Sequence, residues 1–229
     1  MTDTAIDVVG IGNAIVDIIA RCDDAFLDQQ CLAKGHMQLV DRDAATNLYN
    51  AIGPAVEISG GSAANTIAGV ASFGGTAAYI GKVADDDFGR VFAHDIKASG
   101  ESIDTQPAQS ATPTARSIVL VTPDAERTMS TYLGISPELN SSEVDKDVIA
   151  KSRILYLEGY LFDAPQAMEA FRLAAKIAKA SDCEVSLTLS DGFCVDRHRN
   201  EFLAFIKDDI DILFANESEI LSLYETQSL

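Results

Sequence analysis

The stretch ILYL (residues 154–157) opens the most regular part of the chain, and the similar runs VSLTL (185–189) and IDILF (210–214) follow it. Between these runs, the spacing of apolar residues predicts helices at about 165–180 and 197–207. Strands that are almost continuously apolar and alternate with helices are typical of a parallel sheet covered on both faces. The sequence therefore predicts an α/β fold built on such a sheet.

The same pattern extends toward the N-terminus. The run IDVVGIG (6–12) predicts a buried strand closed by glycines, and Thr76–Val83 and Phe88–Ala98 predict a strand followed by a helix. Ser62 is expected to cap a helix that reaches Phe73. We assign these elements to the same α/β core.

Two half-polar segments fit this buried sheet poorly. The first segment, residues 15–58, predicts short strands and one helix with Asp41 as its N-cap. The second segment, residues 115–133, predicts a hairpin of Ala115–Val121 and Arg127–Leu133. We interpret them as a smaller antiparallel lid layer. The predicted division is a core of residues 1–13, 59–113 and 135–229, and a lid of residues 14–58 and 114–134.

The composition and net charge of the chain argue against some classes of ligand and some cellular locations. The chain has 229 residues, 47% of them hydrophobic, and a net charge of −18. Such a charge repels nucleic-acid phosphates and anionic membranes, so we expect a small-molecule ligand instead. No window approaches 18 uncharged apolar residues, and the N-terminus has no signal-peptide pattern. Four scattered cysteines without C-x-x-C spacing predict a reducing, cytoplasmic environment.

A glycine turn follows the first strand. Gly10 and Gly12 begin a dinucleotide-type G-x-G-x-x-G, but Ile15 replaces the third glycine, which argues against a nucleotide-dependent oxidoreductase. An ordinary tight turn is one interpretation. The other is a ligand site, since Asn13 and Asp17 stand past a strand's carboxyl end, where an amide and a carboxylate can hold vicinal sugar hydroxyls.

A second glycine pair directly precedes a predicted helix. Gly60 and Gly61 would let the backbone approach a ligand closely, beside the outward-pointing amides of the first helical turn. The chain contains no G-x-x-x-x-G-K-[ST], so a P-loop NTPase is disfavoured.

A longer set of motifs is collinear along the chain. It comprises GGSAANT (60–66), FGG (73–75), GKVADDDFG (81–89), DAER (124–127) and NESE (216–219). Together with the Gly10–Asp17 turn, this order resembles the PfkB family of ribokinase-like carbohydrate kinases, and the GGSAANT wording is most similar to its adenosine kinase branch. The resemblance implies a three-layer αβα fold with a mainly parallel sheet and a small β-sheet lid.

The resemblance also implies an activity, namely ATP- and Mg²⁺-dependent phosphorylation of a hydroxymethyl group of a nucleoside, adenosine being favoured. Ribose, fructose or 2-keto-3-deoxygluconate are alternative acceptors. The roles that the resemblance implies are sugar binding by Asn13, Asp17, Gly60, Gly61 and Asn65, stabilisation of phosphate charge by Arg127, and contact with the nucleotide by Asn216 and Glu219, with Glu219 reaching Mg²⁺ through water. The base of a nucleoside needs an apolar wall, and the candidates are Tyr160, Leu161, Phe162 and Phe193. For at least half of them, core packing is the alternative interpretation.

One expected motif does not occur. The family's Gly-Ala-Gly-Asp, whose Asp takes the proton of the attacking hydroxyl, is absent from the sequence. We therefore expect a longer polypeptide that continues past Leu229 and carries the catalytic Asp. The alternative is a non-catalytic module that binds a nucleoside or a sugar. Either a monomer or a homodimer through the lid is compatible with the sequence.

Overall fold

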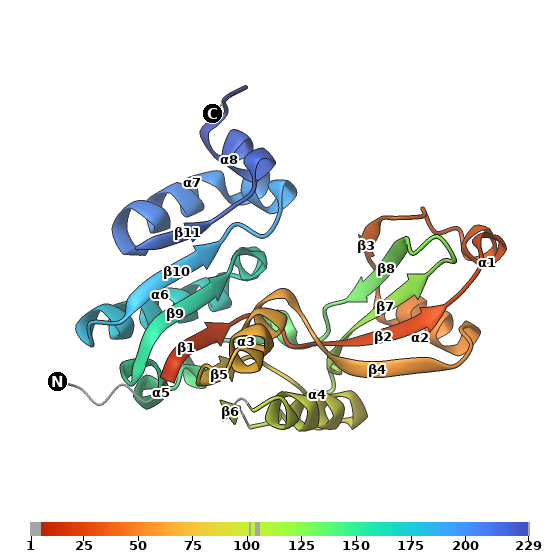
Figure 1. The fold of residues 1–229 in the computed structure, drawn as a ribbon, viewed down its shortest axis with the longest axis horizontal. Coiled ribbons are helices and arrows are strands. Elements are labelled where there is room, and N and C mark those ends of the chain that lie inside the picture. The colour runs from red at the N-terminus through yellow and green to blue at the C-terminus, as the bar shows by residue number, and fades with distance from the viewer. Residues whose placement is uncertain (1–5, 101, 104–105, 229) are drawn as a thin grey trace.

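The computed structural model describes residues 6–100, 102–103 and 106–228 and contains two sheets (Figure 1). The larger sheet is six-stranded, in the order β11-β10-β9-β1-β5-β6, and every pairing described in it is parallel. The smaller one is five-stranded, in the order β3-β8-β7-β2-β4. The predicted α/β class, with a parallel core sheet and a small lid sheet, is confirmed.

The strands of the core sheet are short and, apart from β6, correspond to predicted strands. Their bounds are β1 Ile6–Ile11, β5 Ala77–Ile80, β6 Ser102–Ile103, β9 Ser152–Glu158, β10 Glu184–Thr188 and β11 Ile212–Phe214. Alternate side chains of β1 point to opposite faces of the sheet, so that Val9 and Ile11 join one apolar cluster while Val8 packs against the other. Burial on both faces is what favours apolar residues at successive positions.

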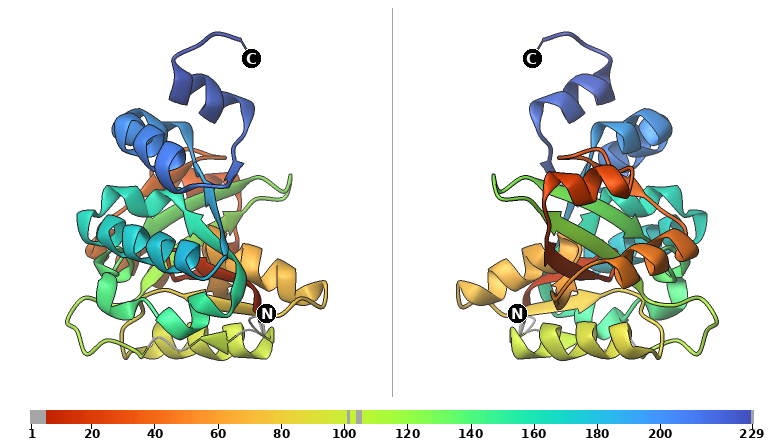
Figure 2. Two further views of the ribbon diagram at one scale, coloured as in Figure 1. Left: turned by 90° about the vertical axis from the view of Figure 1, so that its left-hand side faces the viewer. Right: turned by 90° about the vertical axis from the view of Figure 1, so that its right-hand side faces the viewer.

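Helices cover the two faces of the core sheet. The first cluster contains residues of α5 (Lys146–Ala150), α6 (Pro165–Ala180) and α7 (Gly192–Asp209), and the second contains residues of α3 (Ser62–Ser72) and α4 (Asp87–Ala98). This gives the three layers of the αβα arrangement. After β11 the chain forms α8 (Glu217–Tyr224), which packs on α7 and stands at the rim of the core in both views of Figure 2.

The lid sheet is mixed, which corrects the expectation of an antiparallel layer. Its strands are β2 Ile15–Arg21, β3 Met37–Leu39, β4 Ala55–Gly60, β7 Ala115–Val121 and β8 Arg127–Tyr132. β2 pairs antiparallel with β4 but parallel with β7. The reason lies in the path of the chain, since β2 and β7 both enter the lid from the core, whereas β4 returns to it. Helices α1 (Asp24–Gln29) and α2 (Arg42–Ala51) contribute Leu27 and Leu48 to the apolar cluster on one lid face.

Local sequence signals set most helix ends, with two differences. Asp41 caps α2 as predicted, because its side chain accepts from the Ala44 backbone N–H. Ser62 is not the cap of α3. Gly61 occupies that position, and Ser62 is the first helical residue. Helix α7 begins at Gly192, where the side chain of Asp191 caps it, and is kinked at His198, close to the predicted start at residue 197.

The sequence did not predict several short elements, namely α1, α5, β6 and the 3₁₀ turns η1 Ser136–Glu138, η2 Ser141–Glu143 and η3 Gly159–Asp163. Part of the expected loop at 104–114 lies outside the described residues, at 104–105. Within the described ranges, no helix has the length and apolar character needed to cross a membrane.

Candidate functional site

Two of the connections between core and lid lie side by side. One is the turn that leads from β1 into β2, and the other is the step from β4 into α3. They are adjacent because Ile15, the first residue of β2, pairs with Gly60, the last residue of β4. We call Asn13, Asp17, Gly60 and Gly61 the cradle. The structure thus brings together four of the five residues predicted to bind a sugar.

The cradle depends on the absence of side chains at its two glycines. A Cβ atom on Gly60 would lie 2.3 Å from Oδ2 of Asp17. Gly61 has a φ of +97°, and a Cβ there would lie 2.3 Å from the backbone oxygen of Asn13. Any other residue at Gly61 would therefore meet both backbone strain and a clash.

A glutamate that the sequence analysis did not single out lies beneath the cradle. Glu158, the last residue of β9, is 1% exposed. Its Oε2 accepts from the backbone N (2.6 Å) and Nδ2 (2.9 Å) of Asn13, and its Oε1 accepts from Ser62 Oγ and from the Ala63 backbone N (3.3 Å). Burial raises the pKa of Glu158, and the donated hydrogen bonds act in the opposite direction. A charged residue directly after the apolar run ILYL was the available sequence signal.

Two hydrogen-bond acceptors of the cradle have no donor among the described residues. Asn13 is 4% exposed, and its Oδ1 is buried with no hydrogen-bond partner among the described residues. The carboxylate of Asp17 is partly buried, and burial raises its pKa to about 6. Buried polar groups are normally paired, so these two acceptors call for a ligand that donates hydrogen bonds.

The fifth predicted sugar-binding residue lies in the first turn of α3. The backbone N of Asn65 donates to the backbone oxygen of Gly61 (2.9 Å), and the side chain of Asn65 is exposed. Asn65 therefore lies at the end of α3 that is next to the cradle, and its side-chain amide is open to solvent. Its role in binding stays a prediction.

Two of the residues predicted to form a base-binding wall lie elsewhere. Leu161 and Phe162 are 1% and 3% exposed and belong to the core cluster. The ring of Phe162 stacks on Phe202 with centroids 3.9 Å apart. Both residues fall in η3, which turns their side chains into the core, whereas the neighbouring Tyr160 is only partly buried.

Arg127 is distant from the cradle. It begins β8 and pairs with Val121, which lies four residues further along β7 than Ser117, the partner of Asp17. At about 3.3 Å per residue, this places Arg127 about 13 Å closer to the lid tip. Its side chain is exposed and forms no hydrogen bond or ion pair within the described part of the chain.

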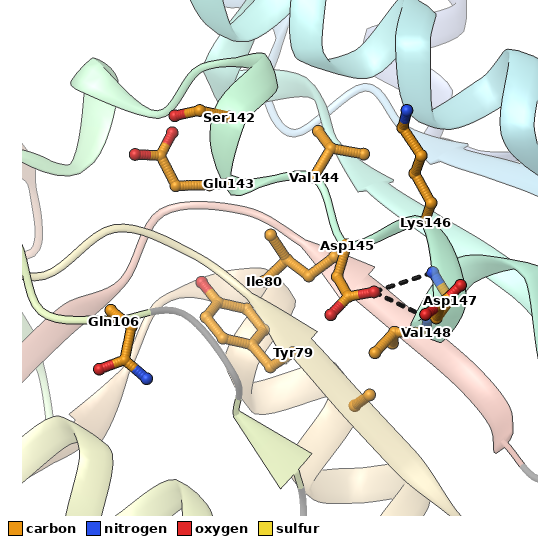
Figure 3. Close-up of a pocket in the computed structure, with 11 residues that line it drawn as sticks. Tyr79, Ile80, Gln106, Ser142, Glu143, Val144, Asp145, Lys146, Asp147 and Val148 are labelled. Atoms are coloured by element: carbon orange, nitrogen blue, oxygen red, sulfur yellow. Dashed lines mark hydrogen bonds between the residues drawn. The ribbon is translucent and has the colours of Figure 1, made fainter.

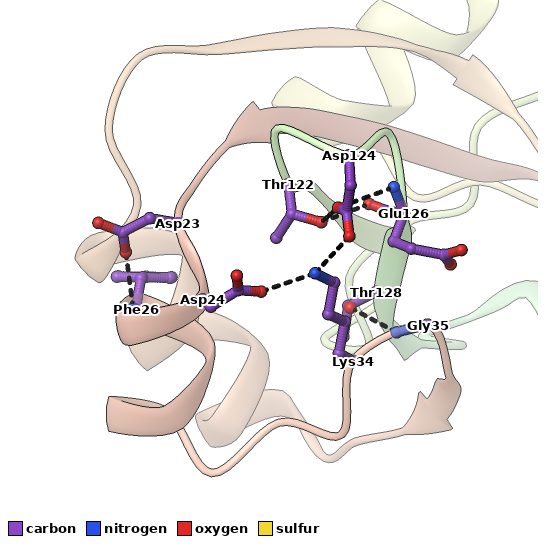
Figure 4. Close-up of polar contacts among 9 residues, drawn as sticks. All are labelled: Asp23, Asp24, Phe26, Lys34, Gly35, Thr122, Asp124, Glu126 and Thr128. Carbon is purple, nitrogen blue, oxygen red and sulfur yellow. Dashed lines mark hydrogen bonds and ion pairs between the residues drawn. The ribbon is translucent and has the colours of Figure 1, made fainter.

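The lid tip itself is closed by a polar network (Figure 4). Lys34 forms ion pairs with Asp24 (2.8 Å) and Asp124 (2.6 Å), and Thr122 also donates to Asp124. These hydrogen bonds, that of Lys34 first, lower the pKa of Asp124 to about 2. The network links α1 to the β7–β8 turn, next to Arg127.

Asn216 and Glu219 form a capping box at the start of α8. Asn216 accepts from the Glu219 backbone N, while the backbone N and Nδ2 of Asn216 donate to Glu219 Oε2 (3.0 Å) and Oε1 (2.8 Å). Glu219 is buried, and both of its carboxylate oxygens accept from Asn216. Its contact with Mg²⁺ through water stays a prediction. Among the described residues, no group of three acidic, His or Cys side chains is placed to hold a metal.

A hollow of about 610 Å³ lies beside β5 (Figure 3). Residues Ser142–Val148 line one side of it, Gln106 lines another, and Ile80 of β5 forms part of its floor. None of the predicted site residues lines this hollow.

Comparison with known proteins gives a consistent result. The family model described as pfkB family carbohydrate kinase matches residues 35–228. Guanosine-inosine kinase from Escherichia coli K12 is 28% identical over 232 residues, which cover 94% of this chain and 52% of that protein. The chain spans about half the length of the curated relatives it matches.

Two solved structures are similar over almost the whole chain. Adenosine kinase from Sinorhizobium meliloti is 55% identical, with a TM-score of 0.88 over 97% of this chain and 68% of that one. A probable sugar kinase from Rhizobium etli CFN 42 is 51% identical, with a TM-score of 0.89 over 100% of this chain and 69% of that one. Both support the ribokinase-like arrangement of core and lid.

Proposed function

Since the chain belongs to the pfkB family of carbohydrate kinases, we propose that the full protein transfers the γ-phosphoryl group of ATP to a hydroxymethyl group of a nucleoside, with adenosine favoured, or of a sugar. The observation that carries this proposal is the pair of unsatisfied acceptors in the cradle. Asn13 Oδ1 is buried without a donor among the described residues, and the Asp17 carboxylate, whose pKa is raised, belongs to the same cradle. Vicinal hydroxyls of a ribose supply the two donors that this arrangement lacks.

The lid face around Asp17 favours a nucleoside over a free sugar. Ile58 pairs with Asp17 across β4 and β2, and Val56 pairs with Ile19 on the same face. All three apolar side chains are exposed, Val56 by 63%. A purine base would cover this surface, whereas a free sugar would leave it in water. The high identity to an adenosine kinase structure supports the same choice.

Closure of the lid would complete the site. We propose that the core (1–13, 59–113 and 135–229) and the lid (14–58 and 114–134) move as two bodies about the cradle, since Arg127 now lies far from it. Mg²⁺-ATP would supply the phosphoryl group, with Asn216 and Glu219 on its side of the site. The residues of the cradle hold and orient the acceptor, and the closed lid excludes water.

Product formation by the full-length protein tests the proposal. We would supply Mg²⁺-ATP with adenosine, guanosine, inosine, ribose, fructose or 2-keto-3-deoxygluconate and detect the phosphorylated acceptor by mass spectrometry. We expect phosphorylation of adenosine at the highest kcat/KM. If none of these acceptors is phosphorylated, the proposed activity is refuted.

The alternative is a module that binds a nucleoside or a sugar without transferring a phosphoryl group. Titration calorimetry separates the two, because the module predicts saturable binding of adenosine but no turnover with Mg²⁺-ATP. The exposed apolar lid face also leaves a homodimer through the lid open beside a monomer, and light scattering of the full-length protein would distinguish them.

A further inference from the structure

Glu158 is the buried carboxylate that the proposed function does not use. We infer that Glu158 is a positioning residue: it fixes the Asn13 amide so that the cradle offers an acceptor, and never a donor, to the ligand. This inference rests on the proposed function in assuming a hydroxyl-bearing ligand. It concerns how the cradle selects that ligand.

The orientation of the Asn13 amide follows from its partners. Oε2 of Glu158 accepts from both the backbone N and Nδ2 of Asn13. Turning the amide by 180° would bring Oδ1 against Oε2, so two acceptors would face each other without a proton between them. Glu158 therefore directs Nδ2 inward and leaves Oδ1 as the group that faces the ligand.

The carboxylate is saturated by the protein itself. Its second oxygen accepts from Ser62 Oγ and from the backbone N of Ala63, both in the first turn of α3. Glu158 thus joins the β1–β2 turn to the start of α3, the two connections on which the cradle is built. With four donors and 1% exposure, its carboxylate is occupied by protein groups instead of facing the ligand.

The surrounding backbone makes room for this carboxylate. A Cβ atom on Gly12 would lie 2.9 Å from Oε2 of Glu158 and 2.4 Å from Cβ of Ala63. The glycine at this position allows the carboxylate to reach the Asn13 backbone. The positioning contact is therefore built from three separate parts of the sequence.

The consequence is a rule for the ligand. The atom that meets Asn13 Oδ1 must carry a hydrogen, because this buried oxygen has no other donor among the described residues. A hydroxyl satisfies the rule, and an ether oxygen, a fluorine or a missing hydroxyl does not. We expect a ligand that breaks the rule to bind roughly tenfold to hundredfold more weakly.

The experiment compares the full-length protein with Glu158→Gln, Asn13→Asp and the double variant. Calorimetry would give the Kd of adenosine, 2′-deoxyadenosine and 3′-deoxyadenosine for each. In Glu158→Gln, an NH₂ group replaces one acceptor. Because each carboxylate oxygen accepts from a backbone N–H, one of these bonds is lost whichever way the new amide lies, and the Asn13 amide is held less firmly. We expect adenosine to bind at least tenfold more weakly and its advantage over the better discriminated deoxy analogue to shrink toward one.

The double variant separates positioning from a merely structural role. Asn13→Asp alone places two carboxylates together and should weaken binding strongly. In the double variant, the new amide at position 158 can donate to the new carboxylate at position 13, so selectivity should partly return. Additive losses in the double variant, or wild-type selectivity in Glu158→Gln, would overturn the inference.

A ligand-free measurement keeps this test apart from that of the proposed function. The side-chain NH₂ signals of Asn13 in nuclear magnetic resonance should show slow exchange and restricted rotation in the wild type and lose both in Glu158→Gln. A freely rotating wild-type amide would overturn the inference even if nucleosides bind. A fixed amide without any nucleoside or sugar binding would instead refute the proposed function alone.

Matched variants guard against loss of the fold. Glu143→Gln makes the same chemical change at a half-buried glutamate that pairs with Lys82 (2.8 Å), and it should leave selectivity unchanged. If melting curves show that Glu158→Gln does not fold, Glu158→Asp keeps the charge but withdraws it by one methylene. It should reduce selectivity in the same direction, and unchanged selectivity would count against the inference.

Discussion

The core and the lid use apolar side chains in opposite ways. In the core, strands β1, β5 and β9 bury theirs between two layers of helices, so Val9, Ile11 and Leu155 are fully enclosed. The lid sheet is covered on one face only. On its other face, which also carries Asp17, large apolar side chains remain exposed: Ile19, Met37, Leu39, Val56 and Ile58.

This difference separates what holds the molecule together from what it presents to other molecules. Enclosed side chains in the core contribute to stability through burial and close packing. The exposed lid residues contribute little to the stability of the free protein and become useful when something covers them. The cradle lies where the two regions meet, and it depends on both.

The largest loss of stability should come from a substitution in the core. Phe162→Ala removes a ring that stacks on Phe202, and we expect it to reduce the free energy of unfolding by about 3–5 kcal/mol. Chemical denaturation would measure the loss. Phe193→Ala, at a side chain that is 77% exposed, should change stability little. If Phe162→Ala kept full stability but lost nucleoside binding, Phe162 would belong to the site and not to the core.

A substitution in the cradle, where core and lid meet, should cause the next largest loss of stability. Gly61→Ala forces a side chain into a backbone of positive φ and against the Asn13 backbone oxygen, so we expect a loss of about 2 kcal/mol or more, together with loss of ligand binding.

Gly69→Ala is the matched control for Gly61→Ala. Gly69 lies in α3, the helix that Gly61 caps, and an added Cβ would meet no atom within 4 Å beyond the local helix backbone, so the substitution should stabilise the protein by about 0.5–1 kcal/mol. Equal melting temperatures for the two variants would contradict the described geometry.

In the lid, the titration of Asp17 should make the stability of the free protein depend on pH. Its pKa is raised from 3.8 to about 6, so the folded state binds this proton more tightly than the unfolded state. The ionised carboxylate therefore costs stability as the pH rises through this range. Asp17→Asn should stabilise the free protein above pH 6, by about 1–3 kcal/mol.

Ligand binding should depend on pH in the opposite direction. The hydroxyls of the ligand need the ionised carboxylate, so adenosine affinity should fall about tenfold per pH unit below pH 6 and stay constant above it. Calorimetry between pH 4.5 and 8 would measure this profile. Asp17→Asn should bind weakly at every pH, and the same sloping profile in this variant would assign the titration to another group.

The smallest effect should arise on the open lid face. Ile58→Thr shortens an exposed apolar side chain beside Asp17, so we expect a change in stability below about 1 kcal/mol. Adenosine should bind roughly fivefold more weakly, while ribose should be unaffected, because only the base would cover this surface. Phe73→Ser, at another exposed side chain, should alter neither Kd. Equal losses for adenosine and ribose would remove the argument for a nucleoside.

Local patterns were sufficient to predict much of the fold. Apolar runs predicted the core strands, and the glycine turns predicted where Asn13, Asp17 and Gly61 come together, because a turn after a strand places its neighbours at the sheet edge. The mixed lid sheet could not be predicted in the same way. The parallel pairing of β2 with β7 joins segments that are separated by a long passage through the core.

There are also physical reasons why the sequence analysis missed Glu158 and expected Leu161 and Phe162 at the site. The predicted strand ended at Leu157, and the importance of Glu158 arises only from donors that folding brings from distant segments. Leu161 and Phe162 follow a strand at the correct sheet edge, but the 3₁₀ turn that follows rotates both into the core. Sequence spacing carries no information about that rotation.

The bond between Glu158 and Asn13 also constrains how the chain matures on the ribosome, because 145 residues separate its partners. At about 5–20 residues per second, translation needs roughly 7–30 s to supply the acceptor for an amide that has already emerged. The β1–β2 turn must therefore wait for β9, and we expect stalled nascent chains to remain protease-sensitive near residue 13 until residue 158 has left the exit tunnel. Protection at shorter lengths would show that another contact takes its place.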